Sequence, residues 1–142
     1  MELSRTRSTF LNGRIQFCLS GASANVVVAR ARKAVLKLSE GLEGLPLGFV
    51  AGETYNQQSI RLNPGDMILA FSDGATDVRS PDGTHLNPRG FLELAEKIAK
   101  ELAAPLALAE FSQALLHGVQ QHCGCDGKLD DDVTLLTLRR IA

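Results

Sequence analysis

Residues 62–77 read LNPGDMILAFSDGATD and contain a turn, an apolar run and an acidic end. The run NPGD at residues 63–66 is a turn by composition, because each of these residue types favours turn backbone angles. Residues 67–71 are apolar at every position, which is typical of a central strand with both faces buried. Asp73 and Gly74 come directly afterwards. The stretch therefore predicts a central β-strand that ends beside a carboxylate.

The residues before this strand predict further strands. Ile15, Phe17 and Leu19 alternate with more polar residues, which is the period-two pattern of a strand with one buried face. Asn12-Gly13 suits a type I′ hairpin turn ahead of it, since both residue types reach positive φ readily. The predicted strands of this half cover residues 9–11, 14–20, 25–30, 34–38 and 59–62.

The residues after the central strand predict two helices and a closing strand. Asn87 is a suitable N-cap and Pro88 a suitable first helical residue, and apolar residues recur at helical spacing to residue 102. A second helix is predicted from Pro105 to residue 122, and a strand over 133–138. This order predicts an α+β fold in which a helix pair packs on one face of a mostly antiparallel sheet. Residues 1–142 are expected to form a single domain, because the length suits one core.

The composition argues against several classes of protein. The chain has 142 residues, of which 44% are hydrophobic, and a formal net charge of -1. This charge is unlike that of a nucleic-acid binder with a basic surface. Every apolar run is far shorter than the roughly 20 residues of a membrane helix, and the first ten residues lack the apolar core of a signal peptide. A cytoplasmic location without membrane or nucleic-acid partners is expected.

The three cysteines, Cys18, Cys123 and Cys125, do not have the even number of a disulfide framework. His122 beside Cys123 and Cys125 raises a metal-binding interpretation, but zinc sites usually use two pairs of ligands. Reduced thiols are therefore expected.

Acidic residues stand at the ends of two predicted strands. Asp73 follows the central strand and Asp131 precedes the closing strand, so both would lie at one sheet edge if these strands are antiparallel neighbours. Mg²⁺ and Mn²⁺ prefer oxygen ligands and take one or two carboxylates from a protein. Gly74 would let the backbone approach the ion, and Asp77 would add an oxygen. The residues alone leave open an ordinary Asp-Gly turn and a solvated aspartate run.

The motifs follow one another in a known order. GLPLG at residues 44–48, LNPGDMILAFSDGATD at 62–77 and DDVTLL at 131–136 resemble bacterial phosphatases of the stage II sporulation E type. These are metal-dependent serine/threonine protein phosphatases of the PPM, or type 2C, family. The resemblance runs from about residue 13 to the C-terminus and covers only the C-terminal portion of the family domain. It implies a partial PPM-type αββα sandwich.

The resemblance also implies a chemistry, in which Mg²⁺ or Mn²⁺ activates a water that attacks phosphoserine or phosphothreonine. It makes Asp73 and Asp131 ligands of one metal, and Asp77 a ligand of an additional, weaker ion. It implies no covalent intermediate, so no catalytic side chain is assigned. The implied partner is a phosphorylated regulatory protein of the anti-sigma antagonist type, which points to sigma-factor regulation in bacterial signalling.

The sequence departs from the family pattern in two places. Family members carry an upstream aspartate that bridges two metals, whereas Asp66 is the first aspartate of this chain. Ser23 stands where the family usually has a histidine. A weak and incomplete metal site is therefore expected. The missing elements would leave one sheet face apolar and open, which predicts a homodimer or larger homo-oligomer.

Two functions remain open from the sequence. The first is a partial phosphatase domain that is active, which the retained acidic motifs favour. The second is a catalytically inactive, phosphatase-like module that binds a regulatory partner protein, which the missing bridging aspartate favours.

Overall fold

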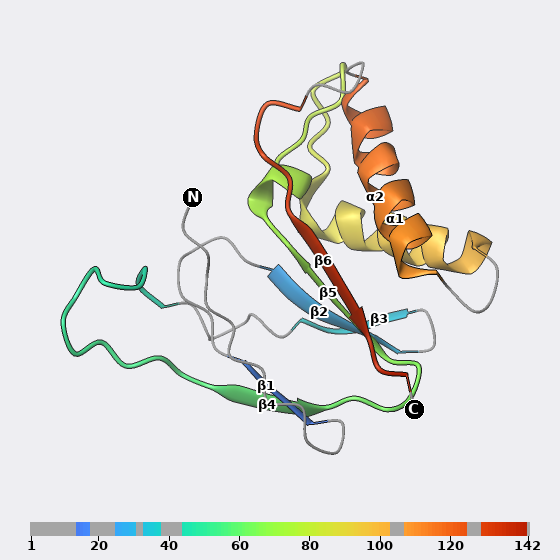
Figure 1. The fold of residues 1–142 in the computed structure, drawn as a ribbon. Helices are drawn as coiled ribbons and strands as arrows, with labels where there is room; N and C mark the ends of the chain where they lie inside the picture. Colours follow the sequence, from blue (N-terminus) through green and yellow to red (C-terminus); the bar gives the residue numbers. More distant parts are fainter. Residues whose placement is uncertain are drawn as a thin grey trace.

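The computed structural model describes residues 14–17, 25–30, 33–37, 44–102, 107–124 and 129–141. Its larger sheet has the strand order β3-β2-β5-β6, and each neighbouring pair is antiparallel. These strands are β2 (Asn25–Arg30), β3 (Lys33–Lys37), β5 (Met67–Phe71) and β6 (Leu135–Arg139). Because β5 lies between β2 and β6, the prediction of a central strand at residues 67–71 is confirmed (Figure 1).

A smaller sheet pairs β1 (Arg14–Phe17) with β4 (Gln58–Arg61), also antiparallel. Its register places Ile15 opposite Ile60, and Ile15 is buried. The hairpin predicted across Asn12-Gly13 lies outside the described residues.

The turn before β5 has the predicted position. The Asp66 N–H donates to the Asn63 carbonyl at 2.9 Å, and the Asp66 carboxylate accepts the Asn63 N–H at 2.8 Å. Asp66 is buried, and the bond from the Asn63 N–H gives its carboxylate a partner that offsets part of the cost of burial. These bonds close a tight turn over residues 63–66, and β5 begins at the next residue.

Two helices follow, α1 (Asn87–Glu101) and α2 (Leu108–Cys123). Asn87 caps α1 as predicted, because its Oδ1 accepts the backbone N–H groups of Arg89 and Gly90 at 3.0 and 3.1 Å. The predicted start of the second helix at Pro105 is wrong, since Ala107 has an extended backbone and α2 begins at Leu108. Neither helix in the described part of the chain combines the length and apolar character needed to cross a bilayer.

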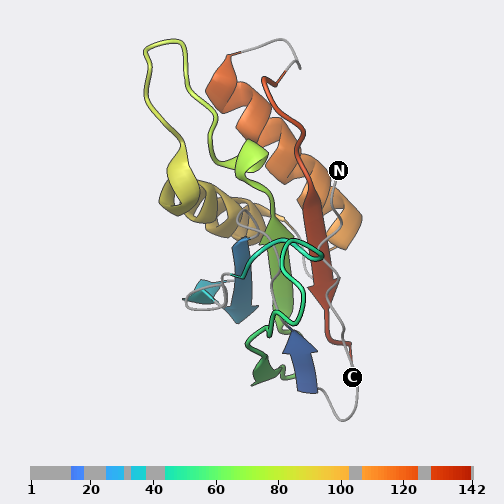
Figure 2. The same cartoon turned by 90° about the vertical axis from the view of Figure 1, so that its left-hand side faces the viewer.

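Both helices pack on the same face of the larger sheet, as predicted, which Figure 2 shows from the side. Alternate residues of β5 join the helices in one core, and the rings of Phe71 and Phe91 lie with centroids 4.4 Å apart. Leu115 and Val119 of α2 are fully buried there. The sheet thus buries one face in this core, and β5 is anchored by it.

The opposite face of the sheet carries the remaining residues of β5 and β6. Ile68 and Ala70 of β5 pair with Leu138 and Leu136 of β6. Leu136 is 59% exposed, whereas Leu135 packs with the helix-side core. This face carries an apolar patch, formed by Ile68, Ala70, Leu136 and Leu138. Only Leu136 of the four is exposed, because Ile68 is buried and the other two are partly buried.

Candidate metal centre

The acidic ends of β5 and β6 lie at one edge of the larger sheet. The antiparallel register pairs Phe71, the last residue of β5, with Leu135, the first residue of β6. Asp73 opens a single 3₁₀ turn, η1 (Asp73–Ala75), directly after β5. The segment that holds Asp131 arrives at the same edge on its way into β6, as Figure 1 shows.

Ser72 joins the two segments. Its N–H donates to the carbonyl of Thr134 at 3.1 Å, and its Oγ accepts the N–H of Thr134 at 3.0 Å. The same hydroxyl donates to the carbonyl of Asp132 at 3.3 Å. These three bonds connect positions about sixty residues apart and continue the contact of the strands beyond the β5–β6 ladder.

Gly74 lies close to the backbone of the segment that holds Asp131 and Asp132. A Cβ at this position would overlap the carbonyl oxygen of Asp132 and would lie 3.6 Å from the carbonyl carbon of Asp131. Only glycine therefore fits here without a shift of the backbone. In this structure the absence of a side chain at Gly74 makes room for the backbone of Asp132. Asp73, Gly74, Asp131 and Asp132 together are called the acidic rim.

The carboxylates of the acidic rim are held by local backbone amides. The Oδ1 atoms of Asp73 and Asp131 each accept the N–H of the following residue, at 3.1 and 2.7 Å. The backbone carbonyl of Asp73 accepts the N–H groups of Thr76 and Asp77, at 2.7 and 2.8 Å, which closes the turn. Asp73 is half-buried and Asp131 is exposed, so the rim is accessible from solvent.

Asp77 has a different surrounding. Its Oδ1 lies 3.4 Å from Nε2 of His85, and its side chain is 67% exposed. Among the described residues, the structure gathers no three His, Cys, Asp or Glu side chains at distances suited to one metal ion. The predicted residues Asp73, Gly74 and Asp131 therefore come together, whereas the Asp77 carboxylate contacts an imidazole.

The carboxylates of Asp73 and Asp131 are donors of the type that hard divalent cations prefer. Two carboxylates beside a solvent-accessible turn suit Mg²⁺ or Mn²⁺, which keep several waters and need few protein ligands. The described residues do not supply the closed tetrahedral set of a structural zinc site.

A loop of residues 78–86 follows the rim and packs on the end of α2. Nε2 of His122 lies 3.1 Å from the carbonyl oxygen of Thr84. Within the loop, hydrogen bonds from Ser80 and Thr84 lower the pKa of Asp82 from 3.8 to about 2. This connection between the rim and α2 has no signal in the sequence apart from the turn residues Pro81-Asp82-Gly83.

Cys123, the last residue of α2, is disulfide-bonded. The expectation of a reduced thiol is therefore wrong for this residue. Cys125 and Cys18 lie outside the described residues.

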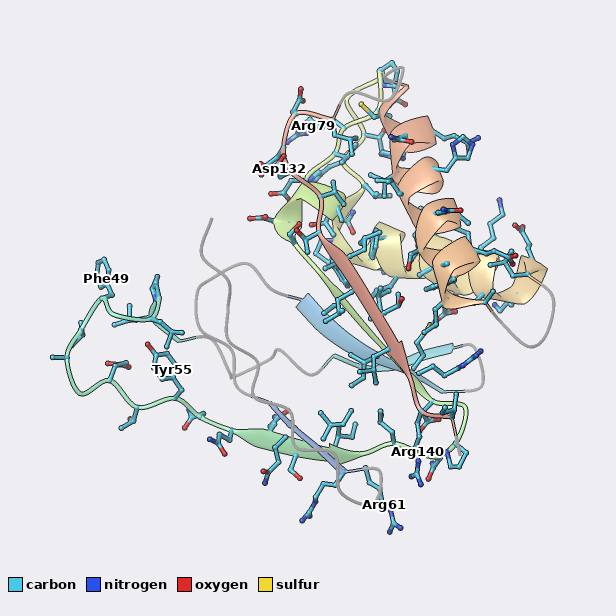
Figure 3. The ribbon with its side chains drawn as sticks, in the orientation of Figure 1. Phe49, Tyr55, Arg61, Arg79, Asp132 and Arg140 are labelled. Atoms are coloured by element: carbon cyan, nitrogen blue, oxygen red, sulfur yellow. The ribbon has the colours of Figure 1, made fainter. Side chains whose placement is uncertain are left out.

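The GLPLG motif lies far from the rim. Residues 44–57 form a loop that projects away from the helices, with Phe49 and Tyr55 on it (Figure 3). The Tyr55 hydroxyl donates to the Pro46 carbonyl at 3.5 Å, across the base of the loop. Figure 3 also places Arg61 and Arg140 at the end of the molecule opposite Asp132. The rim is therefore made by residues of the other two motifs.

Sequence reasoning missed Ser72 as a residue of the site. Its signal is modest, a small polar residue between an apolar strand and an aspartate. Its partners, in residues 132 and 134, follow only from the tertiary structure.

Known proteins resemble the chain in sequence. Protein IcfG of Synechocystis is 27% identical over 109 residues, which are 72% of this chain and 16% of IcfG. The RsbU and RsbW domains of Rv1364c from Mycobacterium tuberculosis are 28% identical, with a TM-score of 0.64 over 92% of this chain and 34% of that one.

Solved structures of lower identity share the fold. The phosphatase domain of the cell fate determinant SpoIIE from Bacillus subtilis is 16% identical, with a TM-score of 0.66 over 99% of this chain and 58% of that one. The same domain presoaked with Mn superposes with a TM-score of 0.63, at 17% identity and over 98% of this chain and 56% of that one. The chain thus spans little more than half of these solved domains, and the predicted partial PPM-type α+β fold is confirmed.

A sequence model of one family, Stage II sporulation protein E, matches residues 9–141. The match includes all three motifs and every described helix and strand. This chain therefore belongs to the stage II sporulation protein E (SpoIIE) family.

Proposed function

We propose that this chain is part of a metal-dependent phosphatase that removes phosphate from phosphoserine or phosphothreonine of a protein in bacterial signalling. The observation that carries the proposal is the acidic rim, where Asp73 and Asp131 are brought to one sheet edge across the Ser72–Thr134 contact. Family membership supports the phosphatase chemistry. The substrate, a phosphoserine or phosphothreonine of a protein, is inferred from the resemblance of the sequence motifs.

Asp73 and Asp131 would hold Mg²⁺ or Mn²⁺, and Asp77 would take part only after separating from His85. When bound, such an ion lowers the pKa of a coordinated water and neutralises phosphate oxygens. The exposure of Asp131 and Asp132 supports access of a bulky phosphoprotein to the rim. The Mn presoaking of the B. subtilis domain supports manganese as the ion to test.

The proposed partner is a phosphorylated regulatory protein of the anti-sigma antagonist type. Support comes from the Rv1364c structure, which contains an RsbW domain together with its RsbU domain. We further propose that the apolar patch packs against a second copy of the chain, because Leu136 exposes a large apolar side chain on this face.

A second function is favoured by a specific observation. The described residues hold no three-ligand metal cluster, and residues 1–65 contain no aspartate. A catalytically inactive module that binds the same regulatory partner through the rim would need neither a metal-bridging aspartate nor a three-ligand metal cluster.

Hydrolysis of an aryl phosphate with excess Mn²⁺ separates the two functions. For the active enzyme, Asp73→Asn should lower the rate by about 10²-fold or more, because a ligand carboxylate becomes a neutral amide. Asp130→Asn is the control, since Asp130 is an exposed acid next to Asp131 of the rim but is not a proposed ligand. A wild-type chain without any Mn²⁺-dependent activity would favour the binding module, and equal rates for the two variants would exclude Asp73 as a ligand.

A further inference from the structure

Ser72 has an unusual position in the ladder between β5 and β6. In a hydrogen-bonded antiparallel pair, each residue donates its N–H to the carbonyl of the other. The Ser72 N–H does so toward Thr134, at 3.1 Å. The Thr134 N–H, however, donates to the Ser72 hydroxyl at 3.0 Å. The side chain thus takes the place of the backbone carbonyl.

This exchange releases the Ser72 carbonyl for another bond. It accepts the N–H of Ala75 at 3.1 Å, and this bond starts the η1 turn that presents Asp73. The hydroxyl has a second task, because it also donates to the Asp132 carbonyl at 3.3 Å. One hydroxyl therefore lets β5 turn at Asp73 and holds the Asp131–Asp132 segment against that turn.

We propose that Ser72 is a positioning residue that sets the separation of the Asp73 and Asp131 carboxylates for a divalent cation. The inference rests on the proposed function, since it concerns the same site. Groups that orient metal ligands typically change metal affinity by about 10- to 100-fold when they are removed. A hydroxyl is required because it must accept an N–H and donate an O–H at once. Threonine supplies both, and alanine supplies neither.

The control comes from the same chain. Ser112 of α2 is also partly buried and its hydroxyl lies 3.1 Å from that of Thr137 in β6, at the helix face of the sheet. Ser112→Ala therefore removes a serine hydroxyl that contacts β6 but not the acidic rim. A purely structural contribution of Ser72 would give the two alanine variants the same behaviour toward Mn²⁺.

The experiment is calorimetric titration of Mn²⁺ into the wild type, S72A, S72T and S112A, with amide hydrogen exchange of Thr134 in each. We expect S72A to lose about 10-fold or more in Mn²⁺ affinity and to exchange the Thr134 amide faster. S72T should stay within about threefold of the wild type, and S112A should match it. Equal Mn²⁺ affinity of S72A and the wild type overturns the inference, even if exchange at Thr134 increases.

Two further results keep the inference apart from the proposed function. A wild type that binds no Mn²⁺ overturns the proposed metal site and the inference with it, whereas binding that is indifferent to Ser72 overturns the inference alone. If S72A does not fold, wild-type exchange decides: saturating Mn²⁺ should slow exchange of the Thr134 amide, and an unchanged rate overturns the inference.

Discussion

At the scale of single residues, the site depends on atoms that most side chains would displace. Gly74 leaves room for the Asp132 carbonyl, Ser72 supplies one hydroxyl with two partners, and the Asp73 carbonyl closes the turn. These features depend on steric fit and hydrogen bonds, and none of them depends on a charged group elsewhere in the protein. They are contacts of backbone and short side chains, so substitutions that remove the Ser72 hydroxyl or add a Cβ at Gly74 should have large effects.

Gly74→Ala should destabilise the protein by about 1–3 kcal/mol, because the new methyl group cannot be placed without moving the Asp131–Asp132 backbone. Urea unfolding measures this free energy. Gly90→Ala is the matched control, since its Cβ meets only the flexible Leu86 side chain at 3.3 Å inside α1, where alanine gains about 0.5–1 kcal/mol over glycine. Two variants with equal stability would contradict the close approach at Gly74.

Asp82 should titrate with a pKa of about 2, below its ordinary 3.8, because the Ser80 hydroxyl and Thr84 hydrogen-bond to the ionised carboxylate. Since the folded-state pKa is the lower one, these bonds stabilise the fold above pH 3.8 and their contribution is lost as the pH falls through about 2. Carboxyl NMR shifts recorded against pH measure the pKa. Ser80→Ala should move it toward 3.8, and an unchanged value in that variant would refute the Ser80 hydrogen bond as the main cause.

At the scale of elements, the periodicity of apolar residues and the helix-capping residues predict where most of the helices and strands lie. The strand at residues 67–71 and the start of α1 follow the predicted bounds, because an apolar run and an Asn-Pro cap are local signals. Two bounds differ. β6 begins at Leu135 and not at residue 133, since the backbone before it bonds to the Ser72 side chain, and α2 begins at Leu108 and not at Pro105.

The cap of α1 can be dissected with two substitutions of Asn87, whose φ is 53°. Asn87→Ala should destabilise by about 1–2 kcal/mol, because alanine loses the cap bonds and also disfavours positive φ. Asn87→Gly loses the same bonds but tolerates this φ, so its cost should be smaller. Thermal unfolding of the two variants provides the comparison. A glycine variant less stable than the alanine variant would show that the positive φ is not retained in solution.

At the scale of the whole molecule, the sheet is covered by helices on one face and carries an exposed leucine on the other. The chain spans 58% of the SpoIIE phosphatase domain of Bacillus subtilis. We expect the assembly of this chain to depend on the apolar patch of β5 and β6, because Leu136 is exposed there.

Leu136→Glu should shift the chain from a dimer toward a monomer, because a charge would be buried at the proposed contact between copies. Light scattering after size-exclusion chromatography measures the mass. Leu116→Glu is the control, since Leu116 is an exposed leucine on α2, on the helix side of the sheet. A wild type that is monomeric at micromolar concentration would contradict the proposed dimer.

The sequence by itself determined the order of the elements, the helix pair, the acidic ends of two strands and the family, because periodicity, caps and motifs are properties of neighbouring residues. Only the tertiary structure decided that Ser72 bonds to Thr134 and Asp132, and that Gly74 admits the Asp132 carbonyl. Those contacts join positions about sixty residues apart. They exist because the antiparallel register of β5 and β6 aligns Phe71 with Leu135, and no local pattern encodes which atoms then meet beyond the last pair.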